Sequence, residues 1–282
     1  MTSAWAEFLQ RFRSPWLDTL VYYITCLGSE WFFLAAVPLL YWTWNKRAGY
    51  RIAVVFLFGE WAKNGLKMAF HTPRPGPTAK AAVLHPETGP GYSFPSGHAE
   101  SSTVFWGQLA LEARKRWLYV LGAILVFLVS MSRLYLNLHW PIDVLGGFVL
   151  GLVLLSLFNV ASTLWANLQL PFAVRALCIL VAPIAMYFIY SGEDSHIVIG
   201  FMMGLPLGRL LDERYLGWNE RASGLANVLK VVLGMAGLLG IRFVLKMVFP
   251  ETALADIARY ALAGLWASFG APLLFVALGW QD

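Results

Sequence analysis

Residues 132–143 read SRLYLNLHWPID, and this short polar stretch separates two long apolar ones. The apolar stretches cover residues 117–135 and 142–165, and each is long enough to cross a bilayer, since a helical span takes about 20 residues. We therefore expect one membrane helix to end, and the next to begin, around a tight polar turn. Such a turn brings polar side chains to the ends of two neighbouring helices.

The polar side chains of this turn have definite places in the two predicted helices. Arg133 lies at the end of the first helix, and His139 and Asp143 lie at the beginning of the second. Pro141 stands between them, and proline is favoured in the first turn of a helix. Since residues four apart share a helix face, we expect the Asp143 carboxylate to reach the His139 ring. A carboxylate there fixes the ring tautomer and leaves the other nitrogen free to attack.

The composition of the whole chain is typical of an integral membrane protein. Of its 282 residues, 59% are hydrophobic and 13% are charged, with a mean hydropathy of +0.61. A soluble domain carries roughly 25% charged residues. The net charge of +5 is small and no basic run exceeds three residues, so no nucleic-acid partner is expected. Cys26 and Cys178 lie in apolar stretches, and we interpret them as buried thiols rather than a disulfide or a zinc site.

The hydrophobic pattern predicts an all-α fold, a polytopic bundle of transmembrane helices. An interfacial helix is expected over residues 3–13, and the short apolar segment 16–27 is expected to be tilted or partly re-entrant. The other predicted spans cover residues 30–45, 49–70, 98–113, 117–135, 142–165, 173–190, 196–211, 225–249 and 254–280. This gives nine or ten spans, depending on the segment 16–27. No basic segment followed by a cleavage site opens the sequence, so no removable signal peptide is expected.

Two further polar clusters interrupt the apolar chain. The first has Lys67 near the end of a predicted span and Arg74 shortly after it. The second, residues 95–98, reads PSGH and precedes another span. Residues 71–95 between them form the longest polar stretch, and their prolines exclude a regular helix. A loop of this length inside a compact protein indicates a functional role.

The PSGH stretch has the features of an anion-binding helix N-terminus. Ser96 is expected to be the N-cap of the helix that follows. The backbone N–H groups of Gly97 and His98 would then point at an anion, as free N–H groups do at other helix N-termini. Gly97 also lets an anion come close to the backbone. The structural alternative is an ordinary cap beside an interfacial histidine.

The distribution of basic residues predicts the orientation of the bundle. The loops on one side of the predicted spans contain most of the clustered basic residues: Arg11, Arg13, Lys46, Arg47, Arg114, Lys115, Arg116, Arg214 and Arg221. By the positive-inside rule this side is cytoplasmic. The loop 71–97, the turn near 136–142 and the acidic loop 192–194 fall on the other side. All three polar clusters are therefore predicted to reach one non-cytoplasmic face.

Together, the three clusters contain the groups that a phosphoryl transfer needs. Arg74 and Arg133 can form forked hydrogen bonds to phosphoryl oxygens, and Lys67 adds a point charge. His139 is the predicted nucleophile, and His98 is the predicted acid that protonates the departing alcohol. Each cation alone could be a side chain that snorkels to the interface. Three cations on one face of the protein, beside two histidines, favour a phosphate site. No metal or other cofactor is expected, because fixed cations take its place.

These clusters resemble the three-part signature of the type 2 phosphatidic acid phosphatase superfamily, which also includes vanadium-dependent haloperoxidases and glucose-6-phosphatase. The resemblance runs from Lys67 to Asp143, about a quarter of the chain, and every signature position holds the expected residue. It implies phosphate binding by Lys67, Arg74, Ser96, Gly97 and Arg133, an acid at His98, a nucleophile at His139 and an orienting partner at Asp143. It also implies a core of about six spans without a metal cofactor.

The same resemblance suggests a division of the chain. A phosphatase core is expected over residues 1–169, and additional transmembrane helices are expected over residues 170–282. Three or four extra spans are similar to the layout of glucose-6-phosphatases and sphingosine-1-phosphate phosphatases. Residues 87–91 resemble the glucose-6-phosphatase branch, whereas Asp143 fits the lipid phosphatases better.

Several functions fit this pattern, and they differ in their substrate. A phosphate site at the ends of spans, where lipid headgroups lie, favours a phosphorylated lipid such as phosphatidate, sphingosine-1-phosphate or an isoprenyl (di)phosphate. A soluble ester such as glucose-6-phosphate is the alternative. A transporter or scramblase would need the cations for binding, but not a His–Asp pair with a second histidine. The expected partners are therefore a phosphorylated lipid substrate and the membrane lipids.

The remaining polar and small residues are predicted to have mainly structural roles. Gly147-x₃-Gly151 and Gly200-x₃-Gly204-x₃-Gly208 have the spacing of closely packed helices. The polar residues with predicted interfacial, pairing or channel-lining roles are His71, His85, His196, Glu60, Lys63, Arg209, Arg242 and Lys246.

Overall fold

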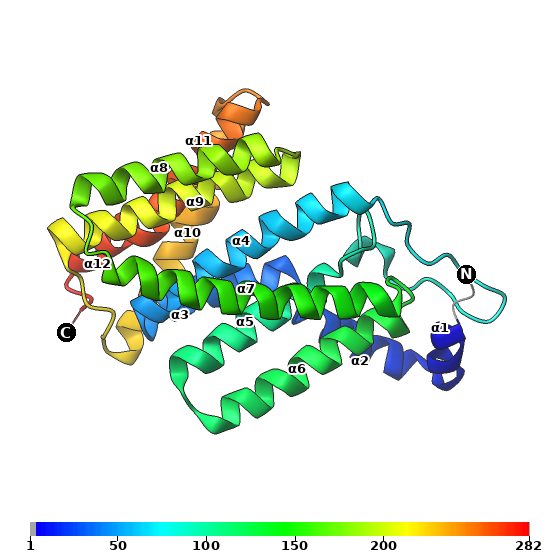
Figure 1. Ribbon diagram of the computed structural model, residues 1–282. Helices are drawn as coiled ribbons and strands as arrows, with labels where there is room; N and C mark the ends of the chain where they lie inside the picture. The colour runs from blue at the N-terminus through cyan, green and yellow to red at the C-terminus, as the bar shows by residue number, and fades with distance from the viewer. Residues whose placement is uncertain (1–3, 282) are drawn as a thin grey trace. The chain divides into compact units, whose positions relative to one another are not determined.

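The computed structural model describes residues 4–281, except for the side chain of Glu193. The described residues form helices, turns and loops without a strand, which confirms the all-α fold class. Residues 1–3 and 282 lie outside the described residues. Three predictions reach into them: the interfacial helix beginning at residue 3, the outer bounds of the two predicted domains at residues 1 and 282, and the signal-peptide prediction, which used the start of the sequence. The helices, labelled in Figure 1, are α1 (Ala4–Leu9), α2 (Pro15–Cys26), α3 (Glu30–Thr43), α4 (Lys46–Phe70), α5 (Gly97–Ala113), α6 (Arg116–Tyr135), α7 (Pro141–Asn167), α8 (Phe172–Ile189), α9 (Glu193–Leu211), α10 (Gly224–Val248), α11 (Ala253–Leu265) and α12 (Ala271–Ala277).

Fewer helices meet the criteria of length and composition for crossing a membrane than the sequence predicts. By length and composition, five of the described helical stretches qualify: α6, α7, α8, α10 and the run Ala253–Ala277. A sixth is possible only if α2 and α3, which meet at 47°, form one broken span. Helix α3, over the predicted span 30–45, is 14 residues long, short of the roughly 20 that a span takes, and it qualifies only together with α2. Helices α4, α5 and α9 do not meet the same criteria of length and composition. The predicted number of spans therefore stays a prediction.

The described residues form two compact units, each assembled from separate stretches of the chain. The first unit contains Met1–Leu34 and Ala62–Val160, and the second contains Ala35–Trp61 and Ala161–Asp282. All three polar clusters belong to the first unit. The division into a core and a C-terminal extension at residues 169–170 stays a prediction.

In the first unit, glycines bring α7 against the beginning of α5. A Cβ on Gly147 would collide with the carbonyl oxygen of Ser96, and a Cβ on Gly151 would lie 2.7 Å from the Cβ of Thr103. Neither position has room for a side chain, which confirms the predicted packing role of this glycine pair. Because Gly147 touches Ser96 directly, α7 determines where the PSGH turn sits.

The long loop between α4 and α5 is held to the first unit by a buried glutamine. The side-chain amide of Gln10 donates to the carbonyl oxygens of Ala82 (2.9 Å) and Tyr135 (2.7 Å), and its oxygen accepts from the Ala82 N–H at 2.9 Å. The Leu84 N–H donates to Leu136 O at 3.0 Å. These bonds tie the N-terminal segment, the loop and the end of α6 into one ordered face. Arg11 and Arg13, which flank this contact, therefore lie at the end of the unit that carries the polar clusters. The prediction that placed these two arginines on the opposite, cytoplasmic side is wrong.

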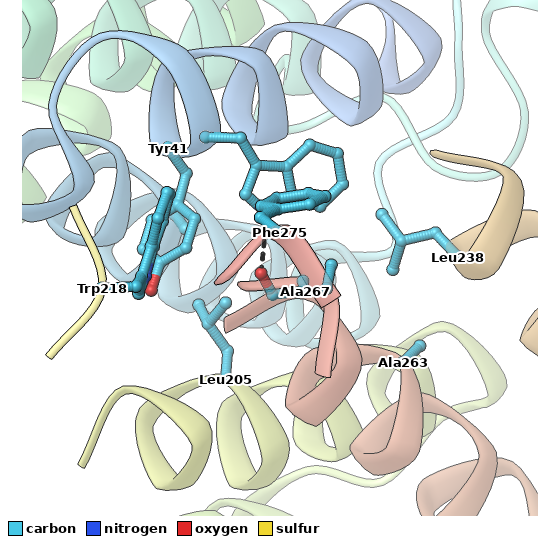
Figure 2. Packing of buried hydrophobic residues seen from close by; sticks show 10 residues of the cluster. Tyr41, Leu205, Trp218, Leu238, Ala263, Ala267 and Phe275 are labelled. Atoms are coloured by element: carbon cyan, nitrogen blue, oxygen red, sulfur yellow. Dashed lines mark hydrogen bonds between the residues drawn. The ribbon is translucent and has the colours of Figure 1, made fainter. Parts of the chain in front are cut away.

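The second unit has an aromatic core around an irregular helical turn. Residues Trp266–Gly270 form a π-helical turn between α11 and α12, and such a turn breaks the regular i→i−4 ladder. The Trp42 indole donates to Ala267 O at 2.8 Å (Figure 2). The Tyr41 hydroxyl donates to Ser268 O at 3.2 Å. Two carbonyls of the turn thus find partners in the buried cluster, in which Trp218 and Phe275 also pack.

The other small-residue motif also packs two helices closely. A Cβ on Gly200 would lie 2.5 Å from Ile257 O, and a Cβ on Gly204 would collide with Ala261 O. The glycines of α9 therefore allow α11 to approach backbone to backbone, as predicted. Next to this contact, Arg209 forms ion pairs with Asp212, so its charge has a structural partner within the unit.

Substituting Gly147 tests whether α7 sets the position of the PSGH turn. Gly147→Ala should lower the free energy of unfolding by about 1–3 kcal/mol, the usual cost of overpacking, because the obstructing atom is backbone. Thermal unfolding in detergent measures this change. Gly240→Ala is the matched control, since a Cβ on this helical glycine meets nothing within 4 Å. Equal stability of the two variants would contradict the packing account.

Candidate active site

His139 lies in the turn between α6 and α7, and its side chain is buried. Its Nδ1 is 3.3 Å from Ser93 Oγ and 3.5 Å from Asp143 Oδ2. The Ser93 hydroxyl donates to the same Oδ2 in a short hydrogen bond, and the Trp140 backbone N–H donates to it at 2.7 Å. Since the hydroxyl hydrogen of Ser93 goes to Asp143, the Ser93 oxygen can only accept from the ring. The hydrogen of the neutral imidazole is therefore on Nδ1.

A second contact assigns the same tautomer. Arg74 Nη1 is 3.0 Å from His139 Nε2. A guanidinium group has donors only, so Nε2 must be the acceptor and carry a lone pair. Nε2, the predicted nucleophilic nitrogen, thus faces a cation on the side of the ring opposite to Asp143.

The other donors of Arg74 all contact backbone carbonyl oxygens. Nε donates to Gly91 O at 2.9 Å, and Nη2 donates to Pro90 O at 2.9 Å and to Tyr92 O at 3.2 Å. Nη1 also donates to Leu138 O at 2.6 Å. Together with the imidazole contact, these bonds use all five N–H groups of the guanidinium. Arg74 therefore links the loop before α5 to the turn that carries His139.

Arg133 is fully buried at the end of α6 and is only partly satisfied. Nη1 donates to Thr25 Oγ1 at 2.9 Å and to Thr88 Oγ1 at 3.1 Å, and Nη2 donates to Thr88 O at 3.0 Å. Its Nε has no hydrogen-bond partner among the described residues. A buried donor on a cation is costly to leave unpaired, so this group is suited to an incoming anion.

The beginning of α5 supplies a hydroxyl and a close backbone approach. Ser96 occupies the N-cap position as predicted, but its hydroxyl forms no capping bond. Its N–H donates to Asp143 O at 2.9 Å, whereas its buried Oγ has no partner among the described residues. A Cβ on Gly97 would lie 3.1 Å from the Lys63 amino group. Lys63 thus places a positive charge directly behind the turn.

The second histidine packs against the break between α2 and α3. A Cβ on Gly28 would lie 3.1 Å from His98 Cδ2 and 2.6 Å from a methyl group of Val129. The missing side chain at Gly28 lets this connection lie on the imidazole. The His98 Nε2 is buried and has no partner among the described residues. It is therefore free to exchange a proton with a bound group.

Burial and positive charge together keep His139 neutral. Burial, followed by the charges of Arg133, Arg74 and Lys67, lowers the pKa of His139 well below its ordinary value of 6.5. Burial lowers the pKa of Arg74 to about 10, so this group stays protonated at neutral pH. The site thus combines a neutral, nucleophilic imidazole with an excess of positive charge.

Three of the predicted site residues carry a buried polar atom without a hydrogen-bond partner among residues 4–281: Ser96 Oγ, His98 Nε2 and Arg133 Nε. Buried polar groups in folded proteins are nearly always paired, so these three atoms are candidates for binding an anion. A tetrahedral oxyanion has enough acceptor oxygens to satisfy all three. Within the described part of the chain, no group of three or more His, Cys, Asp or Glu side chains is arranged to hold a metal ion.

The geometry brings all the predicted site residues into the first unit, and it adds residues that sequence reasoning missed. Ser93 bridges His139 and Asp143, Thr88 and Thr25 hold Arg133, and Gly28 packs on His98. Ser93 and Thr88 lie in the long polar loop, and the predicted functional role of this loop is the only feature of the sequence that points to them. No local pattern distinguishes Thr25 or Gly28, because their importance comes from contacts with segments far away in the chain.

The histidines outside the site pack against aromatic rings. His71, His85 and His196 lie 4.7, 4.5 and 5.9 Å, respectively, between ring centroids from Tyr92, Tyr22 and Tyr187.

Comparison with known proteins identifies the family of this chain. The PAP2 superfamily profile matches residues 48–167, and a second profile, described as the transmembrane extension of PAP2 superfamily phosphatases, matches residues 197–282. Phosphatidylglycerophosphatase B of Bacillus subtilis is 30% identical over 161 residues, which cover 51% of this chain and 75% of that protein. The chain therefore belongs to the PAP2 superfamily, and it is an integral membrane protein. The family predicted from the three clusters is confirmed.

Other relatives are longer than the matched region. A dihydrosphingosine 1-phosphate phosphatase of Schizosaccharomyces pombe is 28% identical over 223 residues, covering 70% of this chain and 53% of that protein. The chain thus spans about half the length of this and another of the curated relatives that it matches. The crystal structure of a PAP2-type phosphatidylglycerolphosphate phosphatase from Bacillus subtilis is 29% identical, with a TM-score of 0.48 over 57% of this chain and 84% of that one.

The titration of His139 tests the electrostatics of the site. In the anion-free protein, the midpoint of its ring signals should lie below pH 6.5, because burial and nearby cations disfavour the charged form. Orthovanadate, a phosphate analogue, should raise the midpoint, since a bound dianion stabilises the imidazolium. NMR of the ¹³C-histidine-labelled protein in detergent measures both values, with the signal assigned by His139→Asn. A midpoint above 6.5 without an anion, or one that vanadate lowers, would contradict this description.

Proposed function

We propose that this protein is a metal-independent phosphatase that removes phosphate from a lipid through a phosphohistidine intermediate. The observation that carries the proposal is the lone pair on His139 Nε2, which faces the Arg74 guanidinium at 3.0 Å while Arg133 and Lys67 are close enough to act on the pKa of the ring. A neutral imidazole in a cationic pocket is suited to attack a phosphate dianion. A transporter would have no use for a histidine held in this tautomer.

In the first step, His139 Nε2 attacks the phosphorus atom in line with the leaving oxygen. The N–P bond forms as the P–O bond to the alcohol breaks, and His98, which is protonated in the complex with the substrate dianion, gives its proton to the departing oxygen. The equatorial oxygens take hydrogen bonds from Arg74, Arg133 and Ser96, where negative charge must be stabilised. As the ring becomes positively charged, the Ser93–Asp143 pair stabilises its Nδ1–H.

In the second step, water replaces the imidazole. His98, now neutral, accepts a proton from the water as its oxygen attacks phosphorus. The N–P bond breaks, its electron pair returns to His139 Nε2, and inorganic phosphate leaves. The starting protonation states of both histidines are restored, so no other reactant is required.

An apolar cavity beside the site supports a lipid substrate. It has a volume of about 570 Å³ and lies between α5, α6 and α7. Its lining begins at Pro141, beside the His139 turn, and reaches Leu155, which is about 21 Å along α7 at ~1.5 Å per residue. That length is a large share of the roughly 30 Å hydrocarbon core of a bilayer. A hydrocarbon chain could therefore lie in this cavity while its phosphate occupies the cationic site.

The relatives and the charge pattern support the remaining details. The names of the two relatives specify a sphingoid phosphate and a phosphatidylglycerol phosphate as their substrates, so we place the substrate of this chain among phosphorylated lipids. The basic residues near 114–116 lie at the end of α5 opposite to the PSGH turn. By the positive-inside rule, the site faces away from the cytoplasm.

A substrate panel tests the proposed function. Purified protein in one detergent should release phosphate from phosphatidate, sphingosine-1-phosphate or isoprenyl diphosphate, and excess EDTA should leave the rate unchanged. Preference for glucose-6-phosphate would favour the soluble-ester alternative, and loss of activity in EDTA would contradict the metal-independent mechanism.

Variants of the nucleophile and its partner provide the control for this assay. His139→Asn should remove detectable turnover, and Asp143→Asn should lower kcat about 10²–10⁴-fold, as expected for the loss of an orienting carboxylate. His196→Asn, in the other unit, is the matched control and should retain full activity. Turnover by His139→Asn at the wild-type rate would exclude this nucleophile.

Filling the cavity tests the placement of the lipid chain. Ala123 lines the cavity, whereas its neighbour Ile124 is exposed and does not. Ala123→Trp should raise KM for a long-chain phosphatidate about tenfold, since several buried methylenes lose their site at about 0.8 kcal/mol each, and should leave a short-chain ester unaffected. Ile124→Trp should change neither value. Identical kinetics of the two variants would place the chain elsewhere.

A further inference from the structure

The segment Thr88–Tyr92, which we name the strap, supplies most of the partners of both arginines. Three of its carbonyl oxygens, those of Pro90, Gly91 and Tyr92, accept from Arg74. The carbonyl and the hydroxyl of Thr88 accept from Arg133. One short segment therefore fixes the two guanidinium groups relative to each other.

Gly89 lies in the strap between these two cations. A Cβ on Gly89 would lie 3.1 Å from Arg74 Nη1 and 3.1 Å from Arg133 Nη2. Its φ of −140° is open to any residue, so the backbone conformation does not require glycine here. The reason for a glycine at this position is space, and this space borders one nitrogen of each arginine.

The strap is held in place at its beginning. The Thr88 hydroxyl donates to His85 O at 2.8 Å, and the N–H groups of Thr88 and Gly89 donate to His85 O and Pro86 O, each at 3.0 Å. The His85 ring packs on Tyr22 of α2 with 4.5 Å between centroids. These contacts fix the beginning of the strap independently of its bonds to the arginines.

We propose that Thr88 and Gly89 are positioning residues for the phosphate. Thr88 holds the Arg133 guanidinium in the orientation that binds phosphate, and Gly89 leaves open the space between the two arginines that the phosphoryl oxygens enter. The inference rests on the proposed function and extends it beyond the three polar clusters. It also requires an exchange of partners. Since Arg74 donates to the nitrogen that must attack, it leaves His139 Nε2 for a phosphoryl oxygen when the substrate binds. The strap carbonyls keep the guanidinium in place during this exchange.

A glycine-to-alanine pair in the same loop tests the role of Gly89. Gly89→Ala should raise the inhibition constant of orthovanadate and the KM of the lipid substrate about tenfold, the effect of weakening one charge-assisted hydrogen bond. Its thermal unfolding midpoint should equal that of the wild type. Gly76→Ala is the matched control, because this loop glycine is exposed, has an ordinary φ and would place its Cβ in open space. Vanadate inhibition unchanged in Gly89→Ala would overturn the proposal.

Thr88 requires a rescue variant, since its hydroxyl also bonds within the strap. Thr88→Val should raise KM and the vanadate constant with a smaller effect on kcat, and Thr88→Ser, which keeps the hydroxyl, should restore both. If serine fails to restore binding, the hydroxyl is not the positioning group.

The same measurements separate this inference from the proposed function. A wild-type protein that neither hydrolyses phosphate esters nor binds vanadate would sink the function itself. A wild-type protein that does both, with Gly89→Ala and Thr88→Val unchanged, would leave the function intact and remove the strap from it.

Discussion

The hydrogen bonds that run from His139 through Ser93 to Asp143 are the constraint on which the site depends. They place the hydrogen of a buried neutral imidazole on Nδ1 and so direct the lone pair of Nε2 toward the cations. The predicted direct bond from Asp143 is long, at 3.5 Å, because the serine stands between the two groups. Asp143 also accepts from the Trp140 backbone and joins α7 to the turn before α5 through its carbonyl, so one residue couples the chemistry to the packing of two helices.

A pair of guanidinium groups, one buried and one half-buried, is costly to keep in a protein interior, and the protein offsets this cost largely with backbone carbonyl oxygens. Arg74 directs every donor at a carbonyl or an imidazole nitrogen, while Arg133 uses two threonines and keeps one donor unpartnered. A loop rich in proline and glycine is suited to this task, because it exposes carbonyls that a helix would use internally. The arginines are therefore held in fixed positions, and in the proposed mechanism an oxyanion takes over the Arg74 donor that contacts His139 and the unpartnered donor of Arg133.

The sequence predicts the parts of the site that depend on local pattern. Pro141 marks the beginning of α7, which brings His139 and Asp143 to one place, and the PSGH stretch does open a helix with Ser96 at its N-cap. Contacts between distant segments leave no such pattern. Ser93 lies 46 positions from His139, and Thr25 lies 108 positions from Arg133. The number of spans stays a prediction, and hydropathy does not reveal that the chain bends between α2 and α3, at the glycine that packs on His98.

The most direct test of the account is chemical identification of the intermediate. Rapid quench of the wild-type protein with ³²P-labelled lipid phosphate should trap label that is stable to base and labile to acid, and peptide mapping should locate it on His139. Asp143→Asn should form the same adduct more slowly. Label on a different residue, or turnover with no trapped label at any quench time while water oxygen enters phosphate directly, would contradict the claim that this imidazole is held in place to attack phosphorus.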